Sequence, residues 1–330
     1  MTAIRVVFMG TPSFAVPTLE ALVADEAFDV RAVVTQPDRP AGRGQRLTPS
    51  PVKTLALAHG LALLQPEKIN TPQAWQALEA LGPIDLAVVA AFGQILRPHL
   101  LAWPKAGCLN VHASLLPRWR GAAPVPHAIL AGDAELGVSL MQMEAGMDTG
   151  PILATRALPA RPPRVDGATS AQRSDAHDGP SDWDTGTALE ALAHLGAALT
   201  VEVAPQWVCG TWPAEAQDAE RATYAPKFDK SLGFIETQRD GHTIERMIRA
   251  FSPSPGASLL WQGQRLKVLS AALCPQLLPE PPQGATLRRL GKRLYLDAPD
   301  GKVLRIERVQ VPGKASMDAA TFLAGYGDRI

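Results

Sequence analysis

Short apolar runs alternate with amphipathic segments along the first third of the chain, and this alternation limits the fold more than any other feature of the sequence. The apolar runs are typical of strands and are Ile4–Gly10, Asp29–Gln36, Leu61–Pro66, Ile84–Gly93 and Cys108–His112. The segments expected to be helical between them are Thr11–Asp25, Pro51–His59 and Thr71–Leu81. This βαβ spacing predicts an α/β fold, a Rossmann-like and mostly parallel sheet with flanking helices.

The rest of the chain predicts a second, smaller domain. Two further strands are expected around a glycine-rich turn at Glu144–Gly150, and Thr187–Val203 returns to a helical pattern. Between them, Pro159–Gly186 holds almost no large apolar residues and is expected to be a loose excursion. From Tyr224 onward a helix over Thr243–Phe251 precedes short strand-like runs, which indicates a small β-barrel or sandwich. The expected domains are 1–206 and 224–330, with a linker at 207–223.

Cysteine spacing, the length of the apolar runs and the first turn disfavour several classes of protein and site. Cys108, Cys209 and Cys274 are far apart and match no metal-ligand spacing, so neither a disulfide framework nor a metal site is expected. The first residues lack the pattern of a signal peptide, and no apolar run approaches the roughly 18 residues of a membrane helix. The first turn, Gly10–Phe14, lacks the second glycine of a dinucleotide fingerprint. We therefore expect a cytoplasmic protein with no membrane contact, no metal and no dinucleotide cofactor.

Two polar side chains stand at the end of an otherwise apolar strand. Asn110 and His112 are two residues apart, so they project from the same face of the strand. An amide and an imidazole there can polarise a carbonyl group and stabilise the oxygen that becomes negative when the carbonyl is attacked. Asp148 lies in the glycine-rich turn and can orient His112 and support its charged form. The alternative is that Asn110 and His112 are structural polar groups and that Asp148 only forms the turn.

A loop with excess positive charge follows the second expected strand. Between Gln36 and Lys53 the cations are Arg39, Arg43, Arg46 and Lys53, and the only acid is Asp38. Such a loop suits contact with phosphates, although a solvated surface loop has the same composition. The chain up to Gln206 has 15 basic against 19 acidic residues, and the rest has 17 against 13. The basic second half fits an anionic partner or chance scatter.

Four stretches of sequence carry a resemblance to a known family. They are "FMGTPSFAVPTLEAL", "TQPDRPAGRGQRLTPSPVK", "LNVHASLLPRWRGAAP" and "GVSLMQMEAGMDTGPIL", with weaker agreement in "TYAPKFDK", "RMIRAFSPSPGA" and "PGKASM". The chain resembles the 10-formyltetrahydrofolate-dependent formyltransferases over most of its length. It departs from them at roughly Ala160–Asp182, which reads as an insertion.

The resemblance implies an enzyme that transfers the formyl group of 10-formyltetrahydrofolate, which it uses as a cosubstrate. Asn110, His112 and Asp148 occupy the positions of the family's catalytic residues. The segment expected to line the folate site is Ser114, Leu115, Leu116 and Pro117. The loop cations Arg39, Arg43, Arg46 and Lys53 are the expected tRNA contacts, and the C-terminal domain is an expected OB-type β-barrel that lies along the tRNA.

Within this resemblance, the basic loop and "RWRGAAP" point to initiator methionyl-tRNA as the acceptor, and we expect a monomer. One alternative is formyl transfer to a small amine such as a sugar nucleotide or a purine precursor. The other is a tRNA-binding protein without activity. The two alternatives predict a missing basic loop and C-terminal domain, or a broken catalytic triplet, respectively.

Overall fold

The computed structural model describes residues 2–41, 46–159 and 183–330. Arg43 and the insertion at 160–182 therefore lie outside the described residues. Contacts divide the chain into two compact units: the first is 1–124, 137–157 and 189–225, and the second is 125–136, 158–188 and 226–330. The first unit contains 207–223, the expected linker, and the domain limits drawn from the sequence stay a prediction.

The first unit is built on a seven-stranded sheet with the order β5-β2-β1-β6-β7-β8-β9. Its strands are β1 (Ile4–Gly10), β2 (Phe28–Val34), β5 (Leu63–Leu64), β6 (Leu86–Ala90), β7 (Cys108–His112), β8 (Glu135–Gln142) and β9 (Ile152–Pro159). The pairings among β5, β2, β1, β6 and β7 are parallel, and β8 pairs antiparallel with β7. The mostly parallel sheet confirms the predicted fold class.

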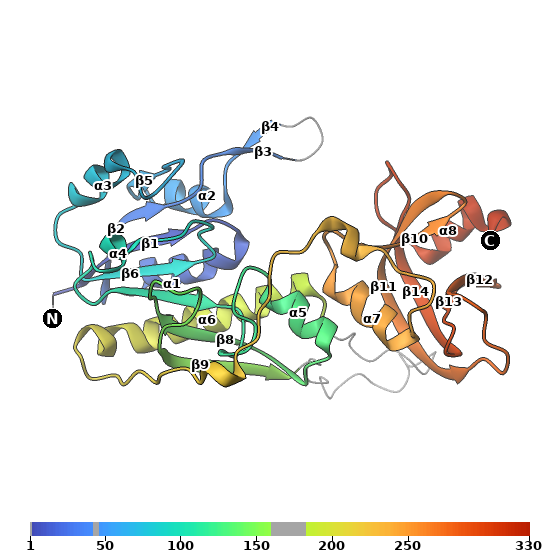
Figure 1. The fold of residues 1–330 in the computed structure, drawn as a ribbon. Coiled ribbons are helices and arrows are strands. Elements are labelled where there is room, and N and C mark those ends of the chain that lie inside the picture. The colour runs from blue at the N-terminus through green and yellow to red at the C-terminus, as the bar shows by residue number, and fades with distance from the viewer. Residues whose placement is uncertain (1, 42–45, 160–182) are drawn as a thin grey trace, which may run out of the picture. The chain divides into compact units, whose positions relative to one another are not determined.

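Helices cover both faces of this sheet (Figure 1). They are α1 (Val16–Ala24), α2 (Pro51–Ala58), α3 (Pro72–Glu79), α4 (Pro98–Leu101) and α6 (Thr185–Val208), with a 3-10 turn at Ser13–Ala15. Leu78 of α3 and Leu100 of α4 pack with Met9 and Cys108 in one core cluster. On the other face α6 comes so close that a Cβ on Gly196 would lie 2.5 Å from Val111. The alternation along β7 therefore places Asn110 and His112 on the face of Cys108, opposite α6.

Local sequence explains where the first helices begin. The Ser50 hydroxyl accepts a hydrogen bond from the Lys53 N–H, and the Thr71 hydroxyl accepts one from Ala74. A proline follows each of these capping residues, at a position where a helix needs no N–H donor. Ahead of α2, the strands β3 (Arg39–Ala41) and β4 (Arg46–Thr48) pair antiparallel as a hairpin.

The second unit carries an antiparallel sheet with the strand order β10-β11-β14-β13-β12, and β15 pairs with β14. The strands are β10 (Ala257–Trp261), β11 (Gln264–Leu277), β12 (Thr286–Leu290), β13 (Arg293–Asp297), β14 (Lys302–Gln310) and β15 (Met317–Asp318). Its helices are α5 (Pro124–Ala131), α7 (Gly241–Ala250) and α8 (Ala319–Tyr326). Ile248 of α7, Phe322 of α8 and Leu304 of β14 share its core. This small β unit agrees with the second part of the predicted fold class.

One helix in the described part of the chain, α6, is long and apolar enough to cross a membrane by length and composition. Half of its most apolar window is buried inside the protein. Together with the close approach of Gly196 to Val111, this burial is typical of a core helix.

An ion pair joins β1 to the start of β6 at the amino end of the parallel strands. Arg5 Nη2 lies 2.8 Å from Asp85 Oδ1, and Arg5 Nε and its backbone N–H donate to Oδ2. These hydrogen bonds from Arg5 lower the pKa of Asp85 to about 2. The ionised carboxylate therefore stabilises the folded state above its unfolded pKa of about 4, and this contribution is lost as the pH falls from about 4 to about 2.

We expect Asp85→Asn to lower the free energy of unfolding at pH 7 by about 1–2 kcal/mol, discounted because the Arg5 side chain is partly exposed. Urea unfolding of both proteins should show this difference shrinking as the pH falls toward 2. Glu202→Gln is the control, because the Arg156–Glu202 pair is exposed on both sides and contributes little. A difference between wild type and Asp85→Asn that does not change with pH would contradict this assignment.

Candidate active site

The polar end of β7 lies at the carboxyl ends of the parallel strands, where ligands bind in open α/β sheets. Cys108 begins this strand in the core, and Asn110 and His112 follow on the same face. His112 is only 6% exposed, whereas Asn110 is partly exposed. The imidazole therefore has fixed surroundings, which an orienting or proton-carrying group requires.

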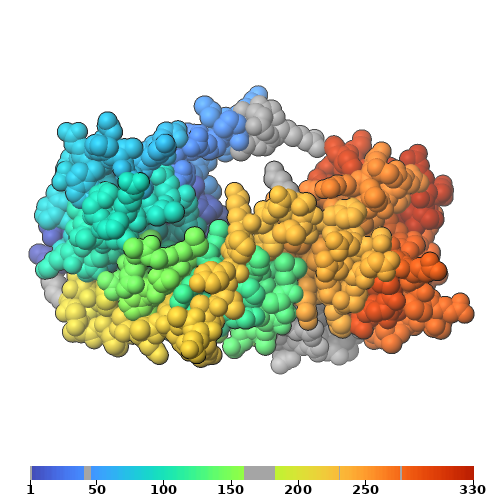
Figure 2. Space-filling view, viewed as in Figure 1, coloured from blue at the N-terminus to red at the C-terminus, as the bar shows by residue number. Residues whose placement is uncertain are grey.

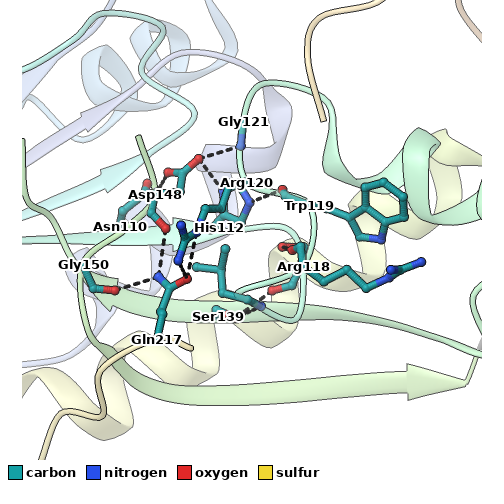
Figure 3. A network of polar contacts seen from close by, with 12 residues as sticks. Asn110, His112, Arg118, Trp119, Arg120, Gly121, Ser139, Asp148, Gly150 and Gln217 are labelled. Carbon is teal, nitrogen blue, oxygen red and sulfur yellow. Dashed lines mark hydrogen bonds and ion pairs between the residues drawn. The ribbon is translucent and has the colours of Figure 1, made fainter. Parts of the chain in front are cut away.

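The turn between β8 and β9 brings Asp148 to the same place (Figure 3). Asp148 has φ +52°, a left-handed conformation that non-glycine residues seldom adopt. Its Oδ2 accepts a hydrogen bond of 2.8 Å from the Gly121 N–H, and its Oδ1 lies 3.5 Å from Asn110 Nδ2. The structure thus brings together the three residues predicted as the catalytic triplet.

The His112 ring is oriented from two sides. Its Nε2 lies 2.9 Å from the Trp119 carbonyl oxygen, and because that oxygen only accepts, Nε2 carries a proton and donates. Its Nδ1 then faces Asp148, 3.7 Å from Oδ2. This distance is within ion-pair range but longer than a hydrogen bond. The backbone of Trp119 therefore sets the ring orientation, and Asp148 supplies negative charge beside Nδ1.

The segment Ser114–Pro117 follows β7 and is held by Ser139 of β8. Ser139 Oγ donates to the Ser114 carbonyl oxygen at 2.7 Å and accepts from the Leu116 N–H at 3.1 Å. Ser114 and Leu116 are buried, and Leu115 packs so closely on Gly137 that a Cβ there would lie 2.3 Å away. Most main-chain polar groups of this segment are thus bonded within the unit, since the Leu115 and Pro117 carbonyl oxygens also accept from the Arg118 and Thr223 N–H groups. The Pro117 ring, which is only partly buried, is left for contact with a ligand.

The cations of the basic loop differ in their surroundings. Lys53 Nζ binds both oxygens of Asp38 at 2.9 and 2.7 Å, and Gln65 Nε2 donates to the same carboxylate. The hydrogen bond from Lys53 is the largest cause that lowers the pKa of Asp38. The Lys53–Asp38 ion pair therefore stabilises the base of the β3–β4 hairpin. Arg39 pairs with Glu67 on the surface, and Arg46 is exposed.

A segment far along the sequence lies against this site, and sequence reasoning missed its role. We call residues 211–225 the strap; its golden atoms lie on the face of the molecule shown in Figure 2. Gln217 of the strap donates from Nε2 to the carbonyl oxygens of Asp148 and Gly150, at 2.8 and 2.7 Å. Its Oε1 accepts from Arg120. The strap is a polar run in the expected linker, and it has no periodic pattern from which the hydrogen bonds of Gln217 could be predicted.

Among the described residues, no group of three or more His, Cys, Asp and Glu side chains is placed to hold a metal ion. The arrangement instead offers an amide, an imidazole and a carboxylate beside backbone donors. Such groups can orient a carbonyl substrate, stabilise an oxyanion and move one proton.

Comparisons with known proteins agree with this chemistry. The sequence profile described as formyl transferase matches residues 4–178, and that of the formyl transferase C-terminal domain matches residues 227–327. The chain belongs to the formyl transferase family. This formyl transferase is 43% identical to the methionyl-tRNA formyltransferase of Methylococcus capsulatus, with 98% of this chain and 97% of that protein covered. It is 44% identical to the enzyme of the same name from Thiobacillus denitrificans, over 97% and 96% of the two chains.

Solved structures share the fold of this formyl transferase. A sugar 3N-formyl transferase, WlaRD, aligns with a TM-score of 0.64 at 17% identity, covering 94% of this chain and 99% of its own. Methionyl-tRNA formyltransferase from Clostridium thermocellum aligns with a TM-score of 0.51 at 14% identity, over 92% and 99% of the two chains. At these identities the likeness concerns the fold alone.

Proposed function

We propose that the protein transfers the formyl group of 10-formyltetrahydrofolate to the α-amino group of methionyl initiator tRNA. The observation that carries this proposal is the 39–45% identity to methionyl-tRNA formyltransferases over nearly the whole chain, the C-terminal part included. A small-amine formyltransferase and a tRNA-binding protein without activity are less well supported, because the relatives at 39–45% identity, which cover both parts of the chain, are named methionyl-tRNA formyltransferase. We also propose a cytoplasmic monomer, in keeping with a role in translation initiation.

The proposed catalytic residues are Asn110, His112 and Asp148. An α-amino group titrates near pH 8, and the ester bond of aminoacyl-tRNA lowers the pKa of the amine further, so the amine is largely neutral and already a nucleophile. The enzyme therefore chiefly orients the two substrates and stabilises the oxyanion. The Asn110 amide is suited to donate to the formyl oxygen. The His112 Nδ1 beside Asp148 is suited to hold a positive charge near that oxygen, and the Asp148 carboxylate is suited to accept the proton that leaves the amine.

The proposed substrate contacts lie on either side of this triplet. Ser114–Pro117 would contact the folate chiefly through the partly buried Pro117, since Ser139 binds the main chain of Ser114 and Leu116 and the Leu115 side chain packs on Gly137. Arg39, Arg46 and the sequence-predicted Arg43 would contact tRNA phosphates. Lys53 would act mainly through the hairpin that it fastens to Asp38.

A competition assay tests the acceptor. The protein is incubated with 10-formyltetrahydrofolate and either methionylated initiator tRNA or amino-sugar nucleotides, and formylated products are separated by chromatography. Formylation of methionyl-tRNA in preference to the sugar nucleotides is expected. Preference for the small amines, or no transfer at all, would refute the proposed function.

We expect Arg43→Ala to raise the KM for methionyl-tRNA about ten- to hundredfold, as for the loss of a specific contact with nucleic acid. The KM for 10-formyltetrahydrofolate should change little, because the triplet and Ser114–Pro117 are untouched. Arg31→Ala is the matched control, since Arg31 pairs with Asp29 on β2, outside the hairpin. Steady-state kinetics measures both KM values. If Arg43→Ala and Arg31→Ala have the same KM for methionyl-tRNA, Arg43 does not contact the tRNA.

A further inference from the structure

We propose that Gln217 is a positioning residue that holds the two loops of the active site at a fixed distance, so that Asp148 stays beside His112 and Gly121. The inference rests on the proposed formyl transfer and adds a residue to its machinery. Gln217 lies on the strap, 69 residues after Asp148, and its hydrogen bond to Asp148 goes to the backbone carbonyl oxygen and not to the carboxylate.

All the hydrogen-bonding capacity of the Gln217 amide is used. Both Nε2 protons are donated, to the Asp148 and Gly150 carbonyl oxygens. Both lone pairs of Oε1 accept, from Arg120 Nε at 3.1 Å and Arg120 Nη2 at 2.8 Å. Since the carbonyl oxygens only accept and the guanidinium only donates, a single orientation of the amide satisfies both sides. Figure 3 shows the amide between them.

Each side of this amide fixes one catalytic loop. The Asp148 and Gly150 carbonyl groups belong to the turn in which Asp148 adopts its positive φ. Arg120, on the other side, is 5% exposed and lies between Trp119 and Gly121. Trp119 supplies the carbonyl oxygen that orients His112, and Gly121 supplies the N–H that binds Asp148. Gln217 thus connects the turn that carries the carboxylate with the loop that orients both the carboxylate and the imidazole.

The strap itself is anchored on both sides of Gln217, which makes the amide a rigid support. Glu215 and Ile152 exchange two backbone hydrogen bonds of 2.8 Å. Thr223 Oγ1 accepts from the Trp119 N–H at 2.9 Å, and the Ala225 N–H donates to the Arg120 carbonyl oxygen. The position of Gln217 is therefore set by backbone contacts that do not depend on its side chain.

Neither glutamate nor methionine, two residues of similar length, can replace the contacts of this amide. Glutamate would keep an acceptor for Arg120 but would place a carboxylate oxygen against the two carbonyl oxygens. Methionine has a similar length but would leave the buried guanidinium and both carbonyl groups without their partner. Both substitutions release the Asp148 turn, and they do so in chemically different ways.

Gln217→Glu tests the proposal, with Gln217→Met as a second variant and Gln206→Glu as the matched control. Gln206 lies on the exposed side of α6, so the same chemical change there should leave kcat unchanged. We expect Gln217→Glu to lower kcat for formyl transfer about ten- to hundredfold, the effect of a misplaced catalytic group. The KM for 10-formyltetrahydrofolate should change by less than about threefold.

A double-mutant cycle separates positioning from a merely structural role. If Gln217 acts through Asp148, then Gln217→Glu should lower kcat by less than about twofold in an Asp148→Asn background, because the carboxylate that it positions is already gone. An equal loss in both backgrounds would overturn the proposal, as would wild-type kcat in both Gln217 variants. The thermal midpoint of each variant shows whether lost activity reflects unfolded protein.

A crystal structure of Gln217→Glu gives a readout that does not need the reaction. The contact of 2.8 Å between the Gly121 N–H and Asp148 Oδ2 should be broken in it, and an intact contact would overturn the positioning role. If the wild-type protein formylates a small amine and not methionyl-tRNA, the proposed function fails, and the cycle is then run with that amine.

Discussion

Asp148→Asn is expected to lower kcat for formyl transfer at least about a hundredfold, the scale of losing one positioned catalytic group. Asparagine keeps the size of the side chain and an oxygen that can accept from the Gly121 N–H. It removes the negative charge 3.7 Å from His112 Nδ1 and the group suited to accept the amine proton. The loss therefore reports on charge and proton transfer and not on packing. Rapid-quench measurement of a single turnover gives the chemical step directly.

Folate binding should survive this substitution. Calorimetric titration with tetrahydrofolate is expected to give a dissociation constant within about threefold of wild type, because the lost interactions form chiefly in the transition state. Asp240→Asn is the control for removing a carboxylate elsewhere, since Asp240 caps α7 through the Thr243 N–H and asparagine also caps helices. Undiminished single-turnover rates in Asp148→Asn would remove Asp148 from the catalytic triplet.

Gly150→Ala is expected to disrupt the same turn from the backbone. A Cβ on Gly150 would lie 2.0 Å from the Gln142 carbonyl oxygen of β8, a distance that no rotation of a side chain relieves. The turn must move away from the strand, and Asp148, two residues earlier, moves with it. We expect kcat to fall about a hundredfold and the free energy of unfolding to fall by about 1–3 kcal/mol.

Gly325→Ala provides the matched control for this glycine. A Cβ on Gly325 meets nothing within 4 Å, and the residue lies in α8, where alanine is the better helix former by about 1 kcal/mol. Urea unfolding and formyl-transfer assays of both variants should show unchanged kcat and equal or higher stability for Gly325→Ala alone. Wild-type kcat and stability of Gly150→Ala would contradict the close contact between residue 150 and the Gln142 carbonyl oxygen.

The elements that position the site follow closely from local sequence. The first and fifth expected strands, Ile4–Gly10 and Cys108–His112, have the bounds that the structure gives them, because most of their residues are apolar, as expected of buried parallel strands. The helix expected at Pro51–His59 is α2, whose capping residue and proline act within one turn. The shared face of Asn110 and His112 follows from the two-residue period of a strand. β12 is not expected from the sequence, because its residues Thr286–Leu290 are mostly exposed and polar and carry no apolar alternation.

The sequence alone determined the mostly parallel sheet, the strand that carries Asn110 and His112, and Asp148 as their partner through the family resemblance. Only the tertiary structure decided what holds these groups: the Trp119 carbonyl oxygen on His112, the Gly121 N–H on Asp148, and the Gln217 amide between the two loops. The physical reason is the range of the interactions. Strand and helix patterns act between neighbours along the chain, whereas these hydrogen bonds join backbone groups and an unpatterned polar side chain that only the completed fold brings together.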